Sequence, residues 1–158
     1  MLYVKLDGQP VESPQVIADV LDIPNLLEEL AYRVAGIIKE DNESSLLAGL
    51  DRHGDPMPTT IRELTPSLSA RLGDGPPLSP KRTGSRSISD FETEVNRISE
   101  TQVYITGRWP NTPFFIYHAE GRAPGGITRD IIGIRESTYD RISEEARQFV
   151  ADRMGGQS

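Results

Sequence analysis

The chain contains no cysteine and only two histidines among its 158 residues. The missing thiols exclude a disulfide framework and thiolate-bound zinc or iron–sulfur centres. The two histidines, His53 and His118, lie far apart in the sequence, so a histidine-rich metal cluster is not expected either. The sequence therefore predicts no bound metal and no cofactor, and the fold must depend on a core that a chain of this length can bury.

Long apolar runs are missing as well. No segment approaches the ~20 apolar residues of a membrane-spanning helix, and the opening MLYVKL lacks the basic-then-apolar pattern of a signal peptide. Only 36% of the residues are hydrophobic, so part of the chain is expected to be extended loop or to bury its surface against partners. We expect a soluble, intracellular protein with no membrane partner.

The chain is acidic, with a formal net charge of -7, which disfavours binding to duplex DNA. Between Arg62 and Arg86, however, five basic residues stand against two acidic ones, a local charge of +3 that leaves -10 for the remainder. No aromatic residues interleave these charges, as they would in a single-strand binding site. The segment either joins subunits through unlike charges or is a solvated loop with incidental arginines, and no specific nucleic-acid binding is predicted.

The first fifty residues show a strand pattern followed by helical patterns. Residues 2–6 alternate in polarity and predict a short strand that Asp7-Gly8 ends. Ser13-Pro14 predicts the start of a short helix through residues 16–21. After Pro24, apolar residues recur every three to four positions from 26 to 38, which predicts a long amphipathic helix. That helix either continues or breaks and resumes through residues 44–49.

The rest of the chain changes character twice. Residues 51–87 are rich in proline, glycine and serine, and a loop of this length is usually functional or disordered until bound. Strand signals over residues 88–98 and 103–106 then predict an antiparallel hairpin, and further strands are predicted at 114–117 and 130–134. The spacing of apolar residues over 135–154 predicts a final helix.

Together these patterns predict one α+β domain over residues 1–158. Its parts are an N-terminal strand and helices (1–50), an extended Pro/Gly/Ser-rich loop (51–87), a β-sheet (88–134) and a C-terminal helix (135–154). The sheet is expected to be antiparallel, with about four strands, and to pack on one face against the N-terminal and C-terminal helices.

Two groups of residues could carry chemistry. Asp51-Arg-His-Gly-Asp55 places a histidine between two carboxylates, which suits a hard or borderline cation, although Asp and Gly here equally predict a turn. His118, Glu120 and Asp130 can be drawn as an acid–base group, but no nucleophile elbow or phosphate-binding loop accompanies them. We therefore predict no catalytic residue.

Several short motifs, taken in chain order, resemble the phage virion morphogenesis family over about residues 13–154. Gly49-Leu-Asp-Arg-His-Gly-Asp-Pro56 is similar to the family's Gly-x-Asp-x-x-Gly-x-Pro segment, and Leu78–Ser87 to its Leu-x-x-x-x-Thr-Gly-Ser signal. After the hairpin, Ile116–Gly121 resembles an aromatic-x-x-His-x-x-Gly signal and Arg129–Ile134 resembles the last strand. The chain departs from the pattern at Met57, where tryptophan is common, and at residues 123–128.

This resemblance implies a structural virion protein, the tail completion or tail terminator protein of a tailed phage. Such proteins form a ring, expected to be hexameric, that caps the tail tube and provides the head–tail joining surface. The implied partners are other copies of the chain, the tail tube protein and the neck or connector protein of the head, with DNA passing at most through the ring lumen. The implied location is the tail or neck of the virion, after assembly in the host cytoplasm.

Two other functions remain open from the sequence: a neck or head–tail connector (head completion) protein, and a small soluble enzyme or regulator. For a ring protein, the expected subunit contacts are the polar residues of the basic segment and of the turn before the last predicted strand. These candidates are Arg62, Arg71, Lys81, Arg82, Arg86, His118, Glu120, Arg122, Arg129 and Asp130. Exposed charge pairs contribute only ~0–1 kcal/mol each, so their role would be to fix the register of neighbouring subunits.

Overall fold

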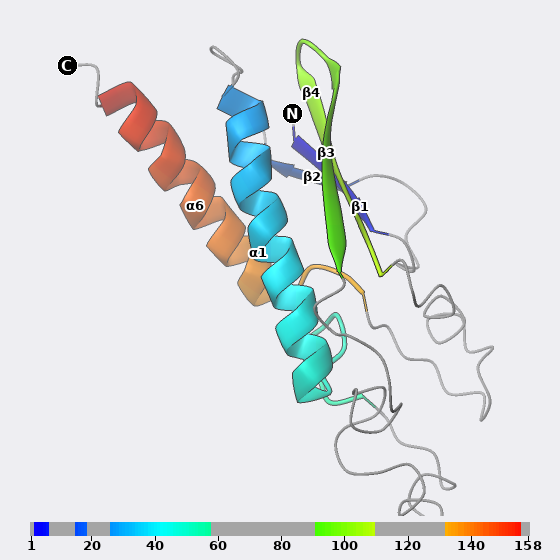
Figure 1. Ribbon diagram of the computed structural model, residues 1–158. Helices are drawn as coiled ribbons and strands as arrows, with labels where there is room; N and C mark the ends of the chain where they lie inside the picture. Colours follow the sequence, from blue (N-terminus) through cyan, green and yellow to red (C-terminus); the bar gives the residue numbers. More distant parts are fainter. Residues whose placement is uncertain (1, 7–14, 19–25, 58–90, 110–131, 156–158) are drawn as a thin grey trace, which may run out of the picture.

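A computed structural model of the chain describes residues 2–6, 15–18, 26–57, 91–109 and 132–155. The elements within these ranges run in the order β1 (Leu2–Leu6), β2 (Gln15–Ala18), α1 (Leu26–Ala48), β3 (Glu92–Ser99), β4 (Gln102–Arg108) and α6 (Glu136–Gly155). Figure 1 shows the two helices side by side on one side of the sheet. The α+β class is confirmed, whereas the predicted loop from residue 58 to 87 and the predicted strand 114–117 lie outside the described residues.

The described strands form a mixed sheet in the order β2-β1-β4-β3, not the antiparallel sheet that we predicted. The hairpin β3–β4 is antiparallel, as expected, with Val95 opposite Ile105. Strand β1 pairs in parallel with β4, from Leu2 opposite Val103 to Leu6 opposite Gly107. Parallel neighbours require a long crossover connection, and the stretch that contains α1 separates β1 from β4 in the sequence. The N-terminal strand β1 therefore lies inside the sheet, between β2 and the β3–β4 hairpin.

Two local predictions were wrong. Residues 15–18 form β2, antiparallel to β1, rather than the start of a helix. Residues 132–134 form a bend before α6 rather than the end of a strand. The reason in the second case is that the backbone of Gly133 is hydrogen-bonded to a side chain of α1 and not to a neighbouring strand.

Helix α1 supplies more buried core residues than any other described element. Its apolar stripe is confirmed, because the residues at the predicted three-to-four spacing are buried, and the helix continues without a break through residues 44–48. Glu28 and Glu29 occupy its first turn, where negative charge suits the helix dipole. The stripe packs against β3 and β4. Its fully buried members and those of the strands are Leu27, Leu30, Ala31, Val34, Ile38, Leu2, Val4, Val103 and Ile105.

Helix α6 runs antiparallel to α1 and packs along it (Figure 1). Buried Ile142, Ala146 and Phe149 form its apolar face, as the spacing predicts. The guanidinium groups of Arg33 and Arg153 lie 4.8 and 5.1 Å from the centre of the Phe149 ring. The Arg33 contact joins α1 to α6 and adds to their apolar packing, whereas the Arg153 contact lies within α6.

The end of the sheet is closed by aromatic packing. Phe91 and Trp109 meet edge to face with ring centroids 4.7 Å apart, and both are buried in the core. A Cβ added at Gly107 would lie 2.7 Å from the Leu6 side chain and 2.8 Å from that of Phe91, so any larger residue would displace one or both of them. Among the described helices, none has the combination of length and apolar character that crossing a bilayer requires.

Candidate functional site

The residues predicted to contact neighbouring subunits cannot be placed in the fold, because all of them fall in 58–90 or 110–131, outside the described residues. They are Arg62, Arg71, Lys81, Arg82, Arg86, His118, Glu120, Arg122, Arg129 and Asp130. Two parts of the motif series do lie within the described residues. These are the segment Gly49–Pro56 and the end of the last motif, residues 132–134.

The segment after α1 begins with a glycine that ends the helix. Gly49 has φ of +74°, in the left-handed region that residues other than glycine rarely adopt. The Leu50 N–H donates to the Ser45 carbonyl at 2.8 Å, and the Gly49 N–H donates to the Leu46 carbonyl at 3.1 Å. This pattern satisfies the last carbonyls of α1 and turns the chain back toward the helix.

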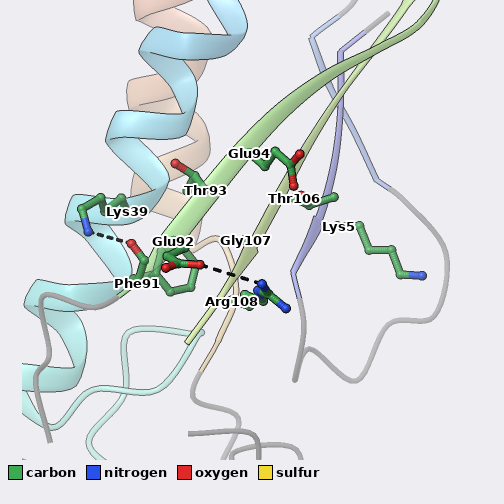
Figure 2. Close-up of a pocket in the computed structure, with 9 residues that line it drawn as sticks. All are labelled: Lys5, Lys39, Phe91, Glu92, Thr93, Glu94, Thr106, Gly107 and Arg108. Carbon is green, nitrogen blue, oxygen red and sulfur yellow. Dashed lines mark hydrogen bonds and ion pairs between the residues drawn. The ribbon is translucent and has the colours of Figure 1, made fainter. Parts of the chain in front are cut away.

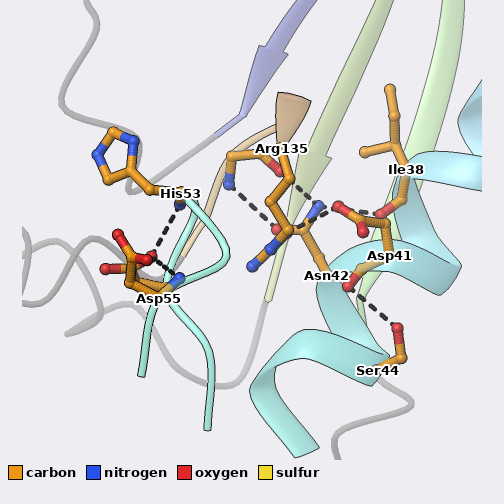
Figure 3. Close-up of polar contacts among 9 residues, drawn as sticks. Ile38, Asp41, Asn42, Ser44, His53, Asp55 and Arg135 are labelled. Carbon is orange, nitrogen blue, oxygen red and sulfur yellow. Dashed lines mark hydrogen bonds and ion pairs between the residues drawn. The ribbon is translucent and has the colours of Figure 1, made fainter. Parts of the chain in front are cut away.

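The histidine between two carboxylates is part of a closed turn. One oxygen of the Asp51 carboxylate accepts the backbone N–H of His53 at 2.8 Å and that of Asp55 at 3.0 Å (Figure 3). Gly54 has φ of +86°, and the Asp51 N–H donates to the Asp55 carbonyl at 2.8 Å. The turn interpretation is therefore confirmed, and within the described ranges no group of three or more His, Asp or Glu residues is arranged to hold a metal ion.

A buried asparagine joins α1 to the bend at residues 132–135. The Asn42 amide nitrogen donates to the carbonyls of Ile38 at 2.9 Å and Gly133 at 3.1 Å, while the Gly133 N–H donates to the Asn42 side-chain oxygen at 3.1 Å (Figure 3). Asn42 is 0% exposed. Its amide thus satisfies both backbone groups of Gly133, 91 residues away in the sequence, where a strand partner would otherwise be needed.

An ion pair and a close contact complete the junction, the place where α1, the Gly49–Pro56 turn and the bend at residues 132–135 meet. Arg135 pairs with Asp41 at 2.7 Å, and their side chains are only 5% and 16% exposed. A Cβ added at Gly133 would lie 2.7 Å from the Cβ of Arg52, so the Gly49–Pro56 turn packs directly on the bend. Burial raises the pKa of the Tyr139 hydroxyl, and the positive charge of Arg52 partly opposes that rise. Two segments that both carry the resemblance are therefore in contact.

A separate polar groove of about 760 Å³ lies at the end of the sheet (Figure 2). On one side of it, the Lys39 ammonium donates to the Phe91 carbonyl at 2.6 Å and to Glu43 at 2.6 Å. Charges of both signs and two threonine hydroxyls line the rest, from Lys5, Glu92, Thr93, Glu94, Thr106 and Arg108. Glu94 and Thr106 are opposite each other in the β3–β4 register, so the groove is a polar surface of mixed charge.

Several residues of the junction were not singled out from the sequence. Asn42 had a detectable signal, because it occupies a position within the apolar stripe of α1, four residues after Ile38, where a polar side chain needs a buried partner. Arg52 and Arg135 gave no comparable signal. No family model, curated protein or solved structure matches this chain.

Proposed function

We propose that this protein is a structural protein of a phage virion: a tail completion or tail terminator protein that assembles into a ring, caps the tail tube and joins it to the head. The observation that carries the proposal is the ordered motif series from Gly49–Pro56 to residues 129–134. It is supported by the contact between the two ends of that series, where Arg52 packs on Gly133. Segments that pack together constrain each other's sequence, which gives a physical reason for the two motifs to occur together.

The same contact favours a role for the junction in fixing the conformation of the turn and the bend over a role in catalysis. The Asp51 carboxylate accepts two backbone N–H groups of its own turn, and the Asn42 amide is fully engaged by backbone groups. A general base must instead reach a reacting proton on a substrate. These groups therefore favour a structural protein over a small enzyme.

We place the ring contacts in the charged segments named from the sequence. The segment 62–86 carries +3 against the -10 of the remainder, so it can bind the acidic surface of a neighbouring subunit. Pro66, Pro76, Pro77 and Pro80 lower the entropy cost of ordering it on binding. The charges around Gly125-Gly126, including Arg122 and Arg129, would then set the register between neighbours.

Native mass measurement and electron microscopy of the purified chain test this proposal. We expect ring-shaped particles of one stoichiometry that bind the end of tail tubes. Deleting residues 66–82 should leave a folded monomer without rings, and a matched variant that changes only Arg71, Lys81 and Arg82 to serine should weaken assembly at constant loop length. A strict monomer that shows hydrolytic activity, lost in His53→Ala, would overturn the structural function.

A further inference from the structure

A shallow groove of about 420 Å³ runs between α1 and α6, apart from the junction and the sheet. Gly36 and Ile37 of α1 form its floor. Its rims are two interhelical ion pairs, Arg33–Glu145 at 3.1 Å and Arg141–Glu40 at 3.2 Å. Three of these four side chains are more than half exposed, so they remain accessible to a second binding partner.

Gly36 is unexpected at this position. It lies in the middle of α1 and is exposed, and a glycine in a helix interior lowers helix stability relative to alanine. A Cβ added there would meet nothing within 4 Å. Packing among the residues that the structure describes therefore does not require glycine at position 36, whereas close approach of another backbone to the helix surface would.

The charges around Gly36 alternate in sign. Each helix contributes one basic and one acidic residue to the rims, and each residue lies beside one of opposite sign on the other helix. Consider a second copy that packs face to face across a two-fold axis. The axis lies in the plane of contact, is perpendicular to the helices and passes near Gly36. Arg33 then lies opposite the second copy's Glu40. The same rotation brings Glu145 opposite the second copy's Arg141. The pattern is therefore complementary to itself.

An exposed aromatic side chain lies on the same surface. Tyr32 is 62% exposed and precedes Gly36 by four residues, which places the two on one side of the helix. Tyrosine is among the residues that most often anchor protein interfaces. A close backbone contact at Gly36 would thus be flanked by one apolar anchor from each copy.

We propose that this α1–α6 surface binds a second copy of the chain in a two-fold contact centred on Gly36. A two-fold contact differs from the head-to-tail contacts that close a ring. It would join two rings face to face. We assign the binding partner as a second copy because the charges of this surface are complementary to those of the same surface on another copy.

Gly36→Gln distinguishes a glycine that is needed for the two-fold contact from a glycine with no such role. If the contact forms, the substitution should stabilise the fold and weaken association. Glutamine favours the helix, so the melting temperature should rise by roughly 2–4 °C. Its side chain blocks close approach, so the dissociation constant of the two-fold contact, measured by sedimentation, should rise at least ~tenfold. Ser44→Ala, at another exposed position of α1, should raise stability without changing association.

Cross-linking gives a direct second measurement, since the chain has no cysteine of its own. Gly36→Cys places the new thiol at the two-fold axis, so mild oxidation should yield a disulfide-linked dimer, and Ser44→Cys should not. A wild-type chain that shows no two-fold contact overturns the proposal. So does unchanged association in Gly36→Gln, or equal cross-linking of the two cysteine variants. Rings that assemble without this contact would leave the proposed function intact.

Discussion

Asn42→Ala tests whether one amide holds the two distant parts of this fold together. The Asn42 side chain bonds both the N–H and the carbonyl of Gly133, and Gly133 itself is buried. Truncation to alanine leaves these two backbone groups without their partner in a place that water reaches poorly. Each buried group left unsatisfied costs about 1–3 kcal/mol. The free energy of unfolding should therefore fall by about 2–5 kcal/mol, a large share of the ~5–15 kcal/mol that typical domains possess.

Urea denaturation followed by circular dichroism measures this loss, and a melting temperature lower by roughly 5–15 °C should accompany it. Asn96→Ala is the matched control, because Asn96 is exposed on β3 and surface substitutions usually change stability by less than ~0.5 kcal/mol. A loss below ~1 kcal/mol for Asn42→Ala would refute the reasoning, since the bend at residues 132–135 would then be held by apolar packing alone.

Three further predictions follow from the same region. Because burial raises the Tyr139 pKa, the folded state keeps this proton longer than the unfolded state, so the free energy of unfolding should fall as pH rises above about 10, less steeply in Tyr139→Phe. Asp51→Ala should cost about 1–2 kcal/mol in chemical denaturation because two backbone N–H groups of the turn lose their acceptor, whereas His53→Ala should be neutral; equal effects would contradict the turn assignment. Gly133→Ala should lower the melting temperature, because the added Cβ meets Arg52 at 2.7 Å, and Gly133→Ala combined with Arg52→Gly should recover part of the loss.

Periodicity predicted the parts of the fold that are held by local pattern. The apolar stripes of α1 and α6 repeat over several turns within helices of 23 and 20 residues, so short irregularities do not obscure them. The β3–β4 hairpin was predictable because a polar turn at Ser99 separates two strand patterns that are adjacent in the sequence. In each case the deciding interactions join residues no more than 16 positions apart or repeat along one helix face.

The misassigned parts depend on contacts between distant residues. Nothing near residues 2–6 specifies that β1 pairs in parallel with β4, since that choice depends on how the whole crossover packs. Residues 132–134 have an apolar, strand-like sequence, yet Asn42 takes the hydrogen bonds that a neighbouring strand would have made. Here a tertiary contact outweighs the local strand propensity, as is common for short segments.

The junction also bears on the structural function that we propose. Catalytic sites keep polar groups available for a substrate, whereas here the carboxylate of Asp51, the amide of Asn42 and the Arg135–Asp41 pair bind other parts of the chain. Polar groups arranged in this way fix the position of a turn and a bend. A protein that must present the same outer surface at every position of a ring needs such fixed connections, because a small change in one subunit is repeated around the whole assembly. Under the function proposed above, the buried polar residues of this chain would set the shape of a surface that other copies bind.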